Sequence, residues 1–216
     1  LVFKKEKYIS DSTKINDQNK FKKDLYSNYH LIIDTILTEK TLGSNTIKDI
    51  EIDIGGNTAW VATASTGIIK IPFKNNIDNN YQYFEKKEGI KDLQINDLYI
   101  QNAEKVWYAT NNGNIGYIEN NQVRDYYQIL DKNVVISSLI IKDQHLFLGT
   151  MGDGIWIANL NNPREIKPLS GIKKLNSKNI YQLIFDADGN LWAGTEKGVN
   201  KIIIDANTSM LDVFYF

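Results

Sequence analysis

The stretch Ile180-Tyr-Gln-Leu-Ile-Phe-Asp-Ala-Asp-Gly-Asn-Leu-Trp-Ala-Gly-Thr-Glu-Lys-Gly-Val199 decides the fold class of this chain. It begins with an apolar run that fits a β-strand, turns at Asp188-Gly189-Asn190, and returns through a second apolar run to Thr195. Asp, Gly and Asn accept the positive φ angles that a tight hairpin turn requires. A glycine and a third apolar run follow, so the stretch predicts consecutive antiparallel strands.

The same order of features recurs three times upstream. Each copy begins with an Ile-led apolar run, at Ile47–Ile52, Ile95–Ile100, Ile136–Ile141 and Ile180–Phe185. An aromatic or apolar pair then leads to a threonine, at Thr63, Thr110, Thr150 and Thr195. A glycine follows each threonine, at Gly67, Gly113, Gly154 and Gly198. The threonines are 47, 40 and 45 residues apart, and such a period is typical of β-propeller blades.

Two further runs complete each copy. The third runs are Ile68–Ile71, Ile115–Ile118, Ile155–Ile157 and Val199–Ile202. The fourth, richer in aromatic residues, are Tyr81–Phe84, Val123–Tyr127, Glu165–Leu169 and Leu211–Phe216. Runs such as Leu139–Ile141 are apolar on both faces, which suits a sheet packed between two others. The sequence predicts an all-β chain, a β-propeller of four-stranded antiparallel blades over about 46–93, 94–135, 136–178 and 179–216. A β-sandwich is the alternative, since it also has short, evenly spaced strands.

Residues 1–45 do not contain a full copy. Leu1–Tyr8 resembles a third strand, Ser10–Lys23 is a polar insertion, and His30–Leu37 predicts an outer strand or a short helix. We therefore expect one domain with a partial or degenerate N-terminal blade. The chain is then part of a larger propeller or an atypical five-bladed ring, and an exposed sheet edge would favour self-association.

Composition narrows the function classes. The 216 residues are 42% hydrophobic and 24% charged, as in an ordinary globular protein. The formal net charge is −1 with mixed signs, which argues against a nucleic-acid partner. No apolar run reaches the length that spans a bilayer, so no membrane insertion by this segment is expected. The chain has no cysteine, which excludes disulfides and thiolate metal sites.

No motif indicates catalysis, a metal site or a cofactor. Only His30 and His145 could serve a nucleophilic triad, and neither lies in a pattern that marks one. Asp186 to Asn190 resembles the start of a calcium loop, but Lys197 stands at its closing position and a hairpin turn explains the residues. No spacing singles out the carboxylate pair that a glycosidase needs.

The loops after the second strands are the candidate ligand-binding region. In a propeller they share one rim with the segments that lead into the first strands. Their polar side chains could bind sugar hydroxyls, although each could also be a solvated turn. The candidate residues are Ser65, Thr66, Asn111, Asn112, Met151, Asp153, Glu196 and Lys197. Trp60, Trp107 and Trp192 share one strand position and are predicted to lie in the core between blades, whereas Trp156 lies in a different strand.

The repeat, clearest from Ile180 to Val199, resembles that of the two-component regulator propeller family. The resemblance covers 46–216 well and 1–45 poorly. The copies depart from the family pattern at Ala62 and Ala109, which replace a Gly, and at Phe147, which replaces Trp. The Asp-Gly turn is also missing from copies two and three.

In that family such blades form the extracytoplasmic, periplasmic sensor portion of bacterial membrane histidine kinases and hybrid regulators. The resemblance therefore implies a non-catalytic propeller that senses an oligosaccharide or another small ligand in signal transduction, with any kinase elsewhere. A protein–protein interaction scaffold is the alternative, and a propeller lyase or hydrolase the second alternative.

Overall fold

The computed structural model describes residues 3–4, 32–33, 42–44, 46–53, 55, 57–72, 80–128, 133–169, 174–205 and 210–216. The chain divides into two compact units, Leu1–Leu42 and Gly43–Phe216. In the first unit β1 (Phe3–Lys4) pairs antiparallel with β2 (Ile32–Ile33). The predicted insertion at Ser10–Lys23 lies outside the described residues, and so does His30. Of the element predicted at His30–Leu37, the structure describes only Ile32 and Ile33. The partial N-terminal blade stays a prediction.

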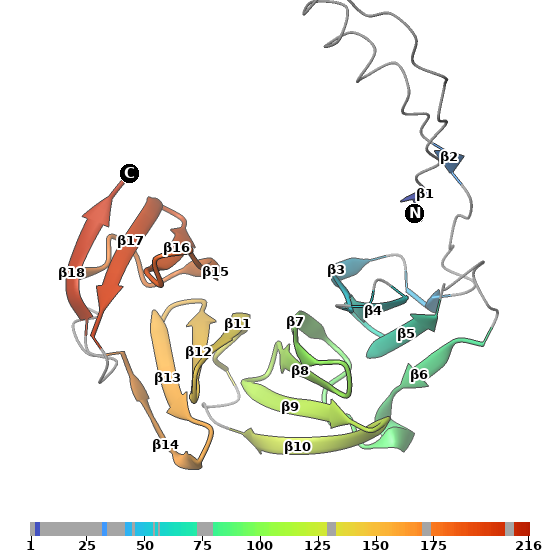
Figure 1. Cartoon of the computed structure of the whole chain (residues 1–216). Coiled ribbons are helices and arrows are strands. Elements are labelled where there is room, and N and C mark those ends of the chain that lie inside the picture. The colour runs from blue at the N-terminus through green and yellow to red at the C-terminus, as the bar shows by residue number, and fades with distance from the viewer. Residues whose placement is uncertain are drawn as a thin grey trace, which may run out of the picture. The chain divides into compact units, whose positions relative to one another are not determined.

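The second unit contains four four-stranded antiparallel sheets, each made of strands that are consecutive in the chain (Figure 1). The first sheet comprises β3 (Ile47–Ile52), β4 (Thr58–Thr63), β5 (Ile68–Pro72) and β6 (Gln82–Phe84). The second comprises β7 (Ile95–Asn102), β8 (Lys105–Thr110), β9 (Asn114–Glu119) and β10 (Gln122–Gln128). The third comprises β11 (Ile136–Lys142), β12 (His145–Thr150), β13 (Ile155–Asn159) and β14 (Asn162–Pro168). The fourth comprises β15 (Ile180–Phe185), β16 (Leu191–Thr195), β17 (Gly198–Ile204) and β18 (Met210–Tyr215).

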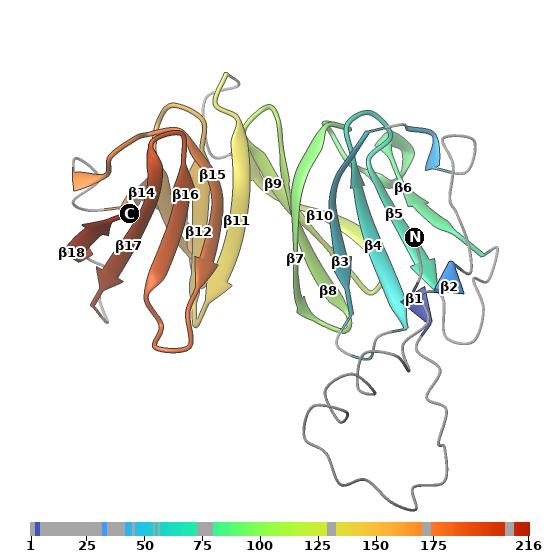
Figure 2. The same ribbon diagram turned by 90° about the horizontal axis from the view of Figure 1, so that it is seen from above.

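A single turn of 3-10 helix, η1 (Lys86–Glu88), follows the first sheet. The sheets stand side by side in chain order, with the first strand of each next to the first strand of its neighbour (Figures 1 and 2). These are the blades of a β-propeller, which confirms the predicted fold class.

Each junction between neighbouring sheets holds its own apolar cluster. Trp60 and Trp107 are buried in the first two junctions, as predicted, and Phe147 takes the same position in the third. Trp192 is only half-buried, because among the described residues no sheet follows the fourth. Packing on both sides explains why so many strands are apolar on both faces.

A bulge near the start of each first strand creates a second kind of contact between sheets. The ladder register shifts just after the leading isoleucine in all four copies. Bulges of this kind redirect side chains. Asp49 Oδ2 accepts the Leu98 N–H at 2.8 Å, Asp97 Oδ2 accepts the Leu139 N–H at 2.6 Å, and Ser138 Oγ accepts the Leu183 N–H at 3.1 Å. We call these three bonds the inter-sheet ladder.

Backbone geometry explains the conserved order of threonine and glycine in the four copies. Gly67 has a φ of +83°, and a Cβ placed there would come 2.3 Å from the Phe84 carbonyl oxygen on the neighbouring strand. Glycine is the residue that tolerates both conditions. The hairpin prediction is also met at Gly189, whose φ is +83°.

Candidate functional site

The repeated threonine closes the turn between the second and third strands. Thr63 Oγ1 donates to the Gly67 carbonyl at 3.0 Å and accepts the Thr66 N–H at 2.9 Å. Thr150 and Thr195 donate to Gly154 and Gly198 in the same way, at 2.8 and 2.9 Å. The hydrogen bonds of these hydroxyls are therefore made within their own turns, and we look for ligand contacts on this rim among the residues that follow them.

The candidate ligand-binding residues lie in the predicted loops and on one rim. Each loop is tied to the segment that leads into the first strand of its own sheet. Asn111 N–H donates to the Gln94 carbonyl at 3.0 Å, and Met151 N–H donates to the Val135 carbonyl at 3.0 Å. The rim geometry thus follows the prediction, while a role for these residues in binding stays a prediction.

One hollow on this rim brings Ser65 and Asn112 together at the junction of the first and second sheets. Its volume is about 350 Å³. The lining residues are Ala64, Ser65, Lys86, Lys91, Asp92, Leu93, Gln94 and Asn112. We call this space the rim hollow. Most of its lining is polar, and Lys86 and Lys91 bring positive charge to it.

Asp92 fixes the shape of the rim hollow. Its Oδ1 accepts the Gln94 N–H at 3.0 Å and its Oδ2 accepts the Asn112 N–H at 3.0 Å. The carboxylate therefore ties the loop of the second sheet to the segment before β7. The Ser65 hydroxyl, the Asn112 carboxamide and the Lys86 ammonium belong to exposed residues and supply hydrogen-bonding groups for a ligand.

Other candidate residues hold the rim together. Glu196 Oε2 accepts from Asn179 Nδ2 at 2.8 Å and its Oε1 accepts from Ser177 Oγ at 2.9 Å. Donation from Asn179, and then from Ser177, lowers the pKa of Glu196. Thr66 Oγ1 lies 2.8 Å from Thr63 Oγ1 within its own turn. The structure does not bring Met151, Asp153, Glu196 or Lys197 to the rim hollow.

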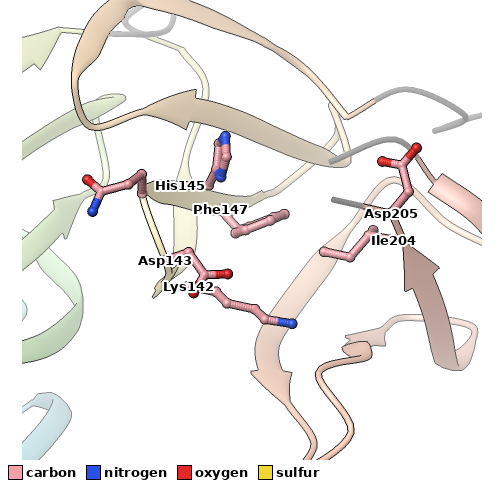
Figure 3. A pocket seen from close by; sticks show the side chains of 7 residues that line it. Lys142, Asp143, His145, Phe147, Ile204 and Asp205 are labelled. Atoms are coloured by element: carbon pink, nitrogen blue, oxygen red, sulfur yellow. The ribbon is translucent and has the colours of Figure 1, made fainter. Parts of the chain in front are cut away.

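A second hollow lies at the opposite ends of the strands, between the third and fourth sheets (Figure 3). Its volume is about 280 Å³, and it is lined by Lys142, Asp143, Gln144, His145, Phe147, Ile204 and Asp205. Lys142 Nζ is already bonded to the Gly189 carbonyl at 2.7 Å and lies 4.8 Å from the centre of the Phe185 ring. This lysine therefore joins two sheets.

Sequence reasoning missed most of both linings. In the rim hollow it named Ser65 and Asn112 but not Lys86, Lys91 or Asp92, which precede a first strand. In the second hollow it considered His145 only as a member of a nucleophilic triad. The reason is the same in both cases: each hollow is lined by segments from two copies of the repeat, and a single copy does not show which residues of the next copy lie beside it.

The structure also brings together two carboxyl groups that the sequence did not pair. Asp97 is buried beside Asp49 on the neighbouring first strand. Burial raises the pKa of Asp97 to about 8, and the negative charge of Asp49 adds to the rise, although the Leu139 N–H opposes it. Both side chains accept backbone N–H groups in the inter-sheet ladder. The pair therefore joins sheets.

Comparison with known proteins supports the repeat and the fold. Residues 174–197 match the family model of the two component regulator propeller. No curated protein matches the chain by sequence. No helix in the described part of the chain is long and apolar enough to cross a membrane.

Several solved structures share the fold. The extracellular domain of BT3049 from B. thetaiotaomicron, described as a hybrid two component system, superposes with a TM-score of 0.62 at 17% identity, over 79% of this chain and 24% of that one. The corresponding domain of BT4673 gives 0.61 at 18% identity, over 85% and 28%. Virginiamycin B lyase from Staphylococcus aureus gives 0.59 at 16% identity, over 79% and 55%.

The chain thus spans about a quarter of the length of the two B. thetaiotaomicron domains. At these identities the likeness shows the propeller fold. The predicted resemblance is confirmed: residues 174–197, which include β15 and β16, match the two-component regulator propeller model, on a chain built of propeller blades.

Proposed function

We propose that this chain is a non-catalytic, ligand-sensing part of an extracytoplasmic receptor of the two-component regulator type. The family repeat at 174–197 and the likeness to extracellular domains of two component systems support this proposal. The signal would be passed on by parts of a longer protein.

The observation that carries a binding role is the rim hollow. Ser65, Gln94 and Asn112 offer hydroxyl and carboxamide groups, which form hydrogen bonds with sugar hydroxyls. Lys86 and Lys91 outnumber Asp92, so the hollow favours a ligand that carries negative charge. An oligosaccharide that contains uronic acid units combines both properties and is the ligand class that we propose.

The carboxyl pair argues against the alternative of a hydrolase or lyase acting through it. Asp97 is 6% exposed and accepts the Leu139 N–H, while Asp49 accepts the Leu98 N–H. A glycosidase needs two carboxyl groups that flank a bound substrate. Asp49 instead binds a backbone N–H of the second sheet, and Asp97 binds one of the third sheet.

Calorimetric titration against neutral and uronic-acid oligosaccharides tests the proposal. We expect an acidic oligosaccharide to bind, and Lys86→Ala and Asn112→Ala to weaken binding about tenfold each, a loss of about 1.4 kcal/mol. Lys87→Ala is the matched control, since it removes the same charge from an exposed residue one position along that does not line the hollow.

A thermal shift provides an independent readout. A ligand that binds only the folded state stabilises it by about 2.7 kcal/mol at 100 times its Kd. A flat response to every sugar, or an equal loss of binding in Lys86→Ala and Lys87→Ala, would contradict the proposed site.

A further inference from the structure

Phe147 stands at the strand position that a tryptophan occupies in the other three sheets. The ladders place it in register with Trp60, Trp107 and Trp192. Trp60, Trp107 and Phe147 all pack against the sheet that follows their own. A phenyl ring is smaller than an indole, so the same position holds less side-chain volume at the junction of the third and fourth sheets than at the two junctions before it.

The second hollow lies beside this smaller ring. Its volume is about 280 Å³, close to the lower limit of about 300 Å³ for ligand pockets, so its ligand must be small. Phe147 from the third sheet and Ile204 from the fourth form the apolar part of its lining, and Figure 3 shows the Phe147 ring on the side of Ile204. An apolar group of a ligand would therefore contact both sheets.

Asp143 brings a negative charge to the hollow. It lies in the two-residue turn between β11 and β12 and has a φ of +53°, a conformation that Asp adopts more readily than most residues. The turn thus fixes where the carboxylate lies. An ionised carboxylate only accepts hydrogen bonds, and an ammonium group is a matching donor.

Lys142 brings a positive charge to the same hollow. Its Nζ donates to the Gly189 carbonyl at 2.7 Å, which holds the ammonium in place. An ammonium has three donors, so this bond leaves donors for a ligand. His145 lies opposite Lys142 in the ladder and adds a ring N–H. In the described part of the chain, no ion pair joins Lys142 to Asp143.

We propose that the second hollow binds a small α-amino acid with an apolar side chain. At neutral pH such a ligand carries an ammonium and a carboxylate together. Asp143 accepts from the ammonium, Lys142 and His145 donate to the carboxylate, and the side chain packs against Phe147 and Ile204. A ligand with a single charge would leave the opposite charge of the hollow without a partner. This site is separate from the rim hollow and does not depend on the ligand proposed there.

Calorimetric titration of the whole chain with valine, leucine, methionine and phenylalanine tests the proposal. We expect leucine to bind, and N-acetyl-leucine and leucinamide to bind about tenfold more weakly, because each lacks one of the two charges. Failure of all four amino acids to bind would overturn the proposal. Equal affinity for leucine and N-acetyl-leucine would also overturn it, since the ligand ammonium would then contribute nothing.

Asp143→Asn tests the carboxylate. It should weaken leucine binding about tenfold and leave the affinity for N-acetyl-leucine unchanged, because that compound has no ammonium. Asn also adopts a positive φ readily, so the variant should fold. Glu104→Gln removes a carboxylate from an exposed residue of the equivalent turn in the second sheet and should keep the native affinity. Equal affinities of Asp143→Asn and the native chain for leucine would contradict the assigned role.

Phe147→Trp tests the space itself. The larger ring should occupy part of the hollow and abolish leucine binding. Because the other three sheets carry Trp at this position, the variant should fold with the native circular dichroism spectrum. Lys86→Ala, in the rim hollow, should keep the native affinity for leucine, which separates the two sites. A Phe147→Trp protein that binds leucine as tightly as the native chain would overturn the proposal.

Discussion

Asp97 lies on β7 with 6% of its surface exposed, and its Oδ2 accepts the N–H of Leu139 on β11 at 2.6 Å. Burial raises its pKa to about 8, from 3.8 for an ordinary aspartate. As the pH rises from about 4 to about 8, the unfolded chain releases this proton before the folded chain does. The contribution of Asp97 to the free energy of unfolding is therefore full below pH 4 and falls as the pH rises toward 8.

Asp97→Asn should remove this pH dependence. A carboxamide accepts the Leu139 N–H and can donate to Asp49, as a protonated carboxyl does. One unit of pKa difference corresponds to about 1.4 kcal/mol, which is roughly 3 to 6 °C in Tm for a chain of this size. We therefore expect the Tm of the native chain, relative to that of the variant, to fall by at least about 3 °C between pH 4.5 and 8.

Glu104→Gln, on the exposed turn after β7, controls for the loss of one negative charge and should keep the native pH profile. Parallel profiles for the native chain and Asp97→Asn would show that Asp97 does not change its protonation in this range.

Thr150 allows a test of the repeated threonine. It is fully buried, donates to the Gly154 carbonyl at 2.8 Å and accepts the Asp153 N–H at 3.2 Å. Thr150→Val keeps the shape but leaves both backbone groups without this partner, at a cost of about 1 to 3 kcal/mol. Urea denaturation should show this loss, whereas Thr150→Ser, which keeps the hydroxyl, should cost less. Equal losses would assign the effect to packing alone.

Two glycines in loops at the ends of strands differ in what a side chain would contact there. Gly67 and Gly152 both have a positive φ, +83° and +107°. A Cβ on Gly67 would meet the Phe84 carbonyl oxygen of β6 at 2.3 Å, whereas a Cβ on Gly152 would meet nothing within 4 Å. The two positions therefore separate conformational strain from steric conflict.

Gly152→Ala should destabilise the chain by about 1 to 2 kcal/mol, the cost of placing an L-residue in a left-handed conformation. Gly67→Ala should cost clearly more, because β6 must also move away from β5. Urea midpoints for the two variants, with unchanged m-values, provide the measurement. A smaller loss for Gly67→Ala than for Gly152→Ala would mean that the last strand of the first sheet shifts freely.

Elements that are determined by residues close together in the sequence could be predicted. The apolar runs, the turn at Gly189 and the glycine after each threonine follow from local chemistry, and all appear in the structure. The period of the repeat then placed the loops after the second strands on one rim. Because Trp60 and Trp107 have a following sheet, their predicted burial was also right.

Features that depend on the meeting of two copies could not be predicted. Asp49 and Asp97 belong to different first strands, and the rim hollow joins Ser65 to Lys86 and Asp92 from outside its loop. Trp192 shows the same limit, since its burial depends on whether a sheet follows. Sequence periodicity identifies equivalent positions, but their environments are set by the neighbouring sheet.

At the scale of the whole molecule, the four sheets form a row in which each contacts its neighbours in the chain. Stability in such repeat proteins is approximately the sum of the stability of each repeat and that of each junction. The same substitution at one repeat position should therefore have a different cost inside the row and at its end.

Trp107 and Trp192 test this expectation. Trp107 is buried between the second and third sheets, so Trp107→Ala should cost about 3 to 5 kcal/mol. Trp192 lacks a following sheet among the described residues and keeps its contact with Phe216 and a 2.8 Å bond from its Nε1 to Asp186 Oδ2. Trp192→Ala should cost only about 1 to 3 kcal/mol, the sum expected for one aromatic pair and one hydrogen bond.

Urea denaturation provides the measurement. Trp107→Phe is the matched control, since the third sheet carries Phe147 at this position, and it should cost much less than Trp107→Ala. If Trp192→Ala is as damaging as Trp107→Ala, the cost at this position comes from within each sheet and not from the junction.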